Sequence, residues 1–86
     1  MKLVITLNQN ELKLEICQKS RVLDSETALY YHDLSDVLIT SLDKLLKRNN
    51  IDTTALKSFK IQGNTGKNGT SYKIAAAFIE GLRAGV

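Results

Sequence analysis

The sequence has no proline, one cysteine and one histidine among its 86 residues. Because Cys17 stands alone, no disulfide can form within the chain, and we expect a reducing, cytoplasmic location. His32 has no cysteine or second histidine near it in the sequence, which argues against a zinc site. We therefore expect neither a bound metal nor a cofactor.

Long apolar runs are also missing. Charged residues interrupt every apolar stretch well before the roughly 18 residues that a membrane span needs. The first strand-like run begins at Lys2, with no signal-peptide pattern before it. Hydrophobic residues nevertheless make up 43% of the chain, which is enough for a packed core and too much for a disordered protein. We expect a single domain over residues 1–86.

The net charge of +3 is unevenly distributed. Residues 1–50 are balanced, whereas residues 51–86 carry five basic and two acidic groups. No two of those basic residues are adjacent, and a nucleic-acid binder usually shows a denser stripe with aromatic residues in it. We expect a solvated basic edge and no direct nucleic-acid binding, with a phosphate or RNA contact as the alternative.

Three strands are predicted at the start of the chain. Residues 2–7 are rich in aliphatic and β-branched side chains, and residues 11–17 alternate between apolar and polar positions. Residues 21–29 follow a weaker version of the same pattern. Short turn clusters separate these segments, so consecutive strands should pair as an antiparallel meander.

The period then changes to that of a helix over residues 33–49. Apolar residues at positions 34, 37, 38, 42 and 45 share one face. Asp33 or Ser35 is expected to cap the first turn, and Asn49 and Asn50 to end the helix.

A short helical turn, a fourth strand and a second helix complete the expected fold. The turn begins at residues 52–54, and residues 57–62 form the strand. A loop over residues 63–71 leads into a helix over residues 72–84, which Thr70 or Ser71 is expected to cap. The order β-β-β-α-β-α predicts an α/β fold in which two helices cover one face of a mixed four-stranded sheet, with the fourth strand parallel to the first. This is half of a ribonuclease H-like or actin-like fold.

Both helices carry more apolar surface than one sheet face requires. The apolar arc of the first helix covers about 200°, against the roughly 100° stripe of a helix packed on a sheet. In the second helix Ile74, Phe78 and Leu82 form one apolar line, beside small residues such as Ala76 and Ala77. We expect helices of a second chain to cover the surplus, unless the two helices cover it by packing on each other.

The glycine-containing loop suggests two interpretations. A phosphate could bind there because glycines allow close backbone approach and a helix follows; the residues concerned are Gly63, Gly66, Lys67, Gly69, Thr70 and Ser71. The spacing does not fit a P-loop, because Asn68 follows Lys67 where that motif has serine or threonine. The other interpretation is a plain turn between strand and helix.

Several segments together resemble the N-terminal half of the TsaB (YeaZ) family, which has a degenerate actin-like ATPase fold. The helix contains Leu42-Asp43-Lys44-Leu45-Leu46, similar to the Ile-Asp-Glu-Leu-Leu stretch of that family. The segments Gly63-Asn64-Thr65-Gly66 and Thr70-Ser71-Tyr72-Lys73-Ile74-Ala75 follow where the family has its glycine-rich turn and second helix, and Glu80-Gly81-Leu82 is similar to its Lys-Gly-Leu. The resemblance covers essentially the whole chain.

The departures from the family pattern concern catalysis. The family's first strand ends in Ile-Asp-Thr, whereas this chain has Ile5-Thr6-Leu7 and lacks the acidic residue. A ribonuclease H nuclease would also need carboxylates on that strand to hold its metal ions. The family's second half, which completes the nucleotide cleft, has no counterpart in the 86 residues. We therefore expect a pseudoenzyme without catalytic residues.

The resemblance implies a partner for the helices. TsaB-like proteins form a helical bundle with the catalytic TsaD subunit, or with a second TsaB, and support threonylcarbamoyladenosine (t6A) modification of tRNA. On this basis we expect docking on a TsaD-like protein or homodimerisation, without membrane binding. The expected interface residues are Leu34, Ile39, Leu42, Leu46, Ala76, Ala77 and Ile79. The alternatives are a phosphate- or nucleotide-binding module and a homodimeric scaffold unrelated to tRNA modification.

Overall fold

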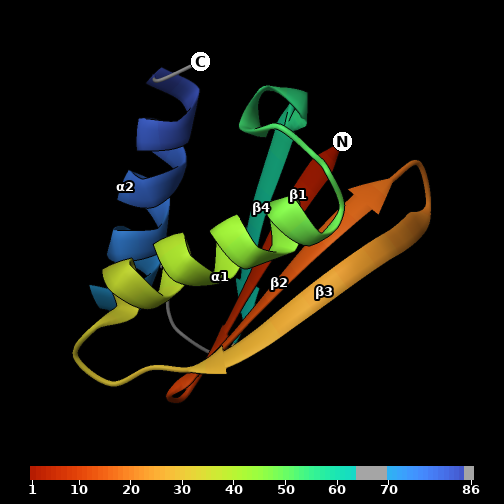
Figure 1. The fold of residues 1–86 in the computed structure, drawn as a ribbon. Coiled ribbons are helices and arrows are strands. Elements are labelled where there is room, and N and C mark those ends of the chain that lie inside the picture. Colours follow the sequence, from red (N-terminus) through yellow and green to blue (C-terminus); the bar gives the residue numbers. More distant parts are fainter. Residues whose placement is uncertain (64–69, 85–86) are drawn as a thin grey trace.

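The elements follow one another in the predicted order, β-β-β-α-β-α (Figure 1). The strands are β1 (Lys2–Asn8), β2 (Glu11–Gln18), β3 (Arg21–Leu29) and β4 (Ser58–Gly63), the helices are α1 (Leu34–Arg48) and α2 (Thr70–Ala84), and the short 3-10 helix η1 (Thr53–Ala55) precedes β4. The structure, a computed structural model, describes residues 1–63 and 70–84, and the side chains of these residues up to 82. Neither described helix is long and apolar enough to cross a membrane.

The four strands form one mixed sheet in the order β3-β2-β1-β4. Two tight turns join β1, β2 and β3 into the predicted antiparallel meander, with Asn10 and Lys19 in the left-handed region at φ values of 61° and 59°. α1 then carries the chain across the sheet. β4 returns parallel to β1, as predicted, with Gly63 opposite Leu7.

The core lies between the sheet and the two helices. The side chains of β1 and β2 that point to this side are fully buried, namely Leu3, Ile5, Leu7, Leu12, Leu14 and Ile16. α1 contacts β2 and β3, and α2 contacts β1 and β4, so both helices cover the same face (Figure 1). The intervening positions on β2, such as Glu11 and Lys13, are exposed. The strict alternation of β2 therefore predicted correctly which side of the sheet is packed.

β3 departs from this alternation because it is an edge strand that carries charge toward the helices. Glu26 lies opposite Leu14, and Asp24 lies opposite Ile16, on the face that α1 covers. The register shifts by one residue between Ile16 and Cys17, which leaves Leu23 in a β-bulge. Inward charges and bulges both discourage pairing of an edge strand with another chain.

Arg48, the last residue of α1, satisfies these inward carboxylates. Its Nε lies 2.8 Å from Oδ2 of Asp24, its Nη1 lies 2.9 Å from Oε1 of Glu26, and its Nη2 donates to the Ser25 carbonyl at 2.9 Å. Asn49 donates a further hydrogen bond to Asp24 at 2.8 Å. The hydrogen bonds from Arg48 and then from Asn49 lower the pKa of Asp24 from 3.8 to about 2. The end of α1 is thus fastened to the edge of the sheet.

We expect this fastening to weaken in acid. The pKa of Asp24 is lower in the folded chain (about 2) than the ordinary 3.8, so its contribution to stability is present above about pH 4 and is lost as the pH falls toward 2. Arg48→Met should lower the urea midpoint of unfolding at about pH 6, and the gap to the wild type should narrow at about pH 2.5. A gap of the same size at both pH values would contradict this assignment.

The predicted N-cap position of α1 is confirmed at Asp33, whereas the predicted cap of α2 is wrong. Asp33 is the N-cap residue of α1 but makes no side-chain cap hydrogen bond, because its carboxylate accepts from the backbone N–H of Tyr31 at 3.1 Å. Ser35 lies inside α1. α2 begins at Thr70, so Thr70 and Ser71 are its first two residues instead of its cap. Side chains of this kind often bond to nearby backbone groups outside the cap geometry.

Candidate interaction surface on the two helices

The two helices bury most of the apolar surface that the sequence indicated was surplus. α1 and α2 contact each other as well as the sheet. The buried apolar residues of the helices are Leu34, Leu38, Leu42, Leu45 and Leu46 on α1 and Ala75 and Ile79 on α2. Ile39 remains outside this packing, with 58% of its surface exposed.

This packing narrows the expected interface. Four of its residues are only 3%, 4%, 6% and 7% exposed within this single chain; they are Leu34, Leu42, Leu46 and Ile79. Ala76 is half-buried, whereas Ile39 and Ala77 are exposed. Most of the two apolar arcs is therefore buried within this chain, in the core that α1, α2 and the sheet share. Docking of the remaining exposed part on a second chain stays a prediction.

A surface hollow of about 230 Å³ lies beside Ile39. We call it the helix groove, and its lining residues are Ile39, Leu42, Asp43, Leu46, Thr53, Phe78 and Leu82. Phe78 and Leu82 stand one turn apart on α2, in the apolar line that the sequence showed, yet they were not among the expected interface residues. The periodicity of α2 could have identified them, since the line includes both.

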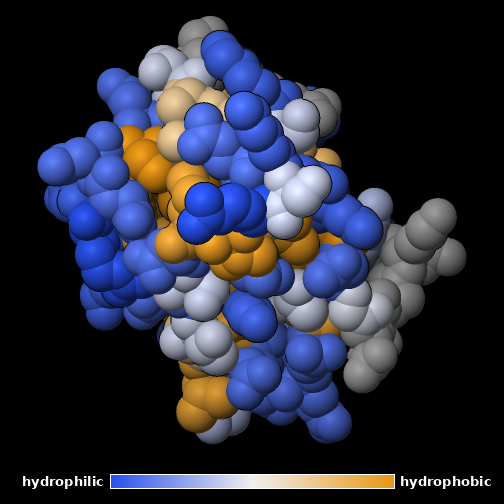
Figure 2. All heavy atoms as spheres, turned by 90° about the vertical axis from the view of Figure 1, so that its right-hand side faces the viewer, coloured by the Kyte–Doolittle hydropathy of each residue, from blue (hydrophilic) through white to orange (hydrophobic). Residues whose placement is uncertain are grey.

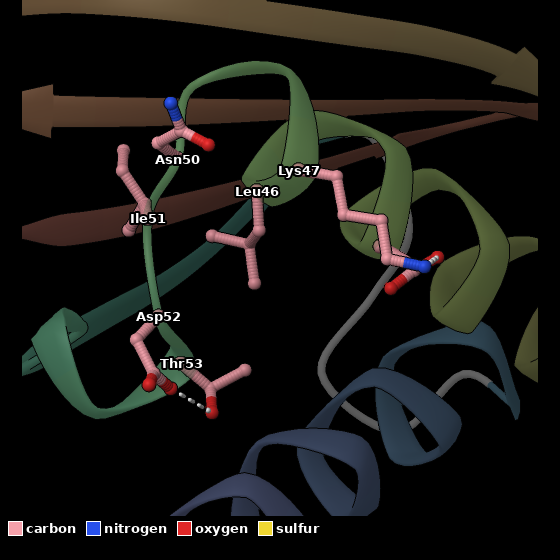
Figure 3. A pocket seen from close by; sticks show the side chains of 7 residues that line it. Leu46, Lys47, Asn50, Ile51, Asp52 and Thr53 are labelled. Carbon is pink, nitrogen blue, oxygen red and sulfur yellow. Dashed lines mark hydrogen bonds and ion pairs between the residues drawn. The ribbon is translucent and has the colours of Figure 1, made fainter.

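A second hollow of about 500 Å³ continues from the helix groove toward the end of α1 (Figure 3). It shares Asp43, Leu46 and Thr53 with the groove and adds Lys47 and the segment 50–52. In Figure 3, Leu46 points from α1 into this hollow. Lys47 Nζ lies 3.0 Å from Asp43 Oδ2, and both side chains are largely exposed. The helix groove therefore has an apolar floor, and the second hollow adds a mostly polar surface with a charged pair at its rim.

The glycine-containing segment lies at the opposite end of β1 and β4 from η1. Gly63 is the last residue of β4, at φ +130°, and a Cβ built on it would lie 1.9 Å from the carbonyl oxygen of Leu7. Gly66, Lys67 and Gly69 lie outside the described residues. The glycine at position 63 is thus explained by its close approach to β1, without a ligand.

Tyr30 fills the space between the end of β1 and the start of α2. It is 5% exposed, and its hydroxyl donates to the Asn8 carbonyl at 3.0 Å and lies 3.4 Å from Ser71 Oγ. The side-chain Nδ2 of Asn10 also donates a hydrogen bond to the Tyr30 carbonyl at 3.1 Å.

Phosphate binding by the glycine-containing segment 63–71 stays a prediction, which titration with ATP and ADP tests.

The single cysteine and histidine lie on different parts of the molecule. Cys17 is half-buried near the end of β2, and His32 is exposed in the connection before α1. Within residues 1–63 and 70–84, no three His, Cys, Asp or Glu side chains come together as a group that could hold a metal ion.

Comparisons with known proteins place the fold. No family model matches the sequence, and no curated protein matches it. Two solved structures match the fold with a TM-score of 0.74 and 17% identity over 99% of this chain. One is YeaZ from Pseudomonas aeruginosa, and the other is an uncharacterized protein with similarity to peptidase YEAZ from Pseudomonas aeruginosa.

The chain spans 40% of the YeaZ structure and 39% of the structure of the uncharacterized protein. Such a share fits the half-length resemblance that the sequence indicated. At 17% identity the likeness concerns the arrangement of the backbone. The chain therefore has the YeaZ-like α/β fold, over about two fifths of the length of the YeaZ structures that it matches.

Proposed function

We propose that this chain is a non-catalytic, TsaB-like interaction subunit of the cytoplasm. In this proposal the helix groove docks on a TsaD-like protein, or on a second copy of the chain, and thereby supports t6A modification of tRNA. The observation that carries the proposal is the exposed Ile39 beside a groove with an apolar floor, on the two helices of a YeaZ-like fold. An exposed apolar side chain beside an apolar groove is typical of the centre of a protein interface.

The absence of a catalytic role is supported by the end of β1. Where the family resemblance expects an acidic residue, this chain has Thr6, whose Oγ1 accepts a hydrogen bond from Gln62 at 3.0 Å. The neighbouring carbonyl of Asn8 is occupied by the Tyr30 hydroxyl. A neutral hydroxyl, and a carbonyl that already accepts a hydrogen bond, are poor groups for activating water or binding a metal–phosphate complex.

Burial of Leu34, Leu42, Leu46 and Ile79 leaves less of the two helices for docking than the sequence suggested. Stable obligate interfaces bury over about 2,000 Å² in total. The groove would therefore be the centre of an interface whose rim carries the Asp43–Lys47 ion pair. Such an interface suits a subunit that associates and dissociates.

A single charged substitution tests the groove. Ile39→Glu should weaken co-purification with a TsaD-like protein by at least about tenfold, because it places a charge on the apolar centre of the contact. Val22→Glu is the matched control: Val22 is 54% exposed, close to the 58% of Ile39, but lies on β3. Both variants should unfold at the wild-type temperature within a few degrees.

If the Ile39→Glu and Val22→Glu variants co-purify equally well with the TsaD-like protein, the groove is not part of the interface. Self-association that Ile39→Glu abolishes, without any binding to a TsaD-like protein, would assign the groove to a second copy of this chain. Binding of ATP or ADP that Lys67→Ala weakens would favour the nucleotide-binding alternative.

A further inference from the structure

The open edge of β3 divides into a protected half and an unprotected half. The bulge at Leu23 and the inward charges held by Arg48 protect the half from Arg21 to Glu26. Neither device is present in the segment from Thr27 to Leu29 that follows. An edge segment without such devices can pair with an extended segment of another protein.

The backbone of this second half is oriented for pairing. The N–H of Tyr30 donates to the Asn10 carbonyl of the neighbouring hairpin at 3.0 Å. Because alternate residues of an antiparallel strand bond to the same neighbour, Ala28 also faces β2, and Thr27 and Leu29 direct their N–H and C=O groups toward the open edge. Two consecutive pairing positions are thus available there.

Exposed apolar side chains accompany these backbone groups. Leu29 is 63% exposed and Tyr31 is 67% exposed, the largest values among the large hydrophobic residues that the structure describes. Figure 2, which views the side of the molecule along which β3 runs, shows its apolar surface as separate areas among polar side chains. A hollow of about 280 Å³ lies next to Leu29, between β3 and α1, with Ala28 and Val37 in its lining.

The rim of this hollow is acidic. Asp33 and Asp36 line it at the start of α1, and both are exposed. Within the described residues, neither carboxylate forms an ion pair; Lys44 lines the far end of the same hollow. The local charge is therefore negative on a protein whose net charge is +3.

We propose that the β3 edge from Thr27 to Tyr31 binds an extended segment of another protein in which basic and apolar residues alternate. The segment would add as a strand beside β3, with its backbone bonded to Thr27 and Leu29. Its apolar side chains would lie on Leu29 and Tyr31, and its lysine or arginine residues would lie beside Asp33 and Asp36. Main-chain bonds supply affinity in this mode of recognition, and the alternating side chains supply specificity.

This surface is distinct from the helix groove. The groove uses Ile39 and Asp43 of α1, whereas the β3 hollow uses Asp36 and Val37. The proposal therefore stands whether or not the helix groove binds a TsaD-like protein, and the chain could bind two partners at once.

Titration with a synthetic octapeptide of alternating lysine and valine tests the proposal, with the glutamate–valine octapeptide as its control. Amide shifts followed by NMR should be saturable and should centre on Thr27–Tyr31 and the first turns of α1. Because the protein is cationic overall, general attraction would favour the glutamate peptide. N-methylation of the amides along one edge of the lysine peptide should weaken its binding by at least about tenfold, since it removes main-chain bonds.

Two variants locate the contact. Leu29→Asn and Asp36→Asn should each weaken binding of the lysine peptide by about threefold or more, and Val22→Asn, on the protected half of the same strand, should leave it unchanged. The proposal is overturned if the lysine peptide does not saturate the protein, if the shifts map elsewhere, or if the N-methylated peptide binds equally well.

Discussion

Replacing Gly63 by alanine is expected to destabilise the protein by at least about 2 kcal/mol, a large part of the roughly 5–10 kcal/mol of a domain of this size. The added Cβ would lie 1.9 Å from the Leu7 carbonyl oxygen and 2.8 Å from the Leu7 nitrogen. Because β1 lies inside the sheet, its backbone cannot easily move aside, so the end of β4 at Gly63 would have to move away from Leu7. The residue also has φ +130°, which side chains rarely tolerate. Urea unfolding followed by circular dichroism measures the change.

Gly81→Ala is the matched control for this prediction. Gly81 lies within α2, and a Cβ built on it meets nothing within 4 Å. Alanine is the better helix former by about 1 kcal/mol, so this variant should be as stable as the wild type or more stable. Similar losses in both variants would contradict the close approach of β4 to β1.

Tyr30→Ala is expected to cost about 3–5 kcal/mol, because it removes a buried aromatic ring from the point where three elements meet. The ring is 5% exposed, and its hydroxyl reaches the Asn8 carbonyl at 3.0 Å and Ser71 Oγ at 3.4 Å. Tyr30→Phe keeps the ring and loses these bonds, at a cost of about 1 kcal/mol. Thermal and urea unfolding of both variants should show this order.

The neighbouring tyrosine provides the control. Tyr31 is 67% exposed, so Tyr31→Ala should change the stability by no more than about 0.5 kcal/mol. If both alanine variants lose the same stability, Tyr30 does not join β1 to α2 as described.

The strands, their order and the parallel return of β4 could be predicted because each depends on local patterns. The alternation of β2 fixed its buried face, and the short turns at Asn10 and Lys19 left only antiparallel pairing for the first three strands. The weaker alternation of apolar and polar residues in β3 reflects its place at the edge of the sheet. Its inward residues Asp24 and Glu26 are charged because Arg48 lies above them.

The sequence of each helix, taken alone, could not show which apolar residues lie in the core and which are left for a partner. Periodicity gives the width of an apolar arc but not the direction of a second helix that packs on it. Periodicity therefore predicts partner contacts for Leu42 and Leu46, which the structure buries within this chain. Long-range contacts have the same difficulty: nothing local in the sequence shows that Gly63 approaches Leu7.

The central proposal is that the helix groove joins this chain to another polypeptide. Sedimentation velocity of the purified protein, alone and mixed with a TsaD-like protein at about 50 μM each, tests it most directly, since this concentration would populate even a micromolar complex. The proposal predicts a faster boundary that contains this chain, either with the TsaD-like protein or as a dimer, and its disappearance in Ile39→Glu. A single slow monomer boundary in both samples would contradict it.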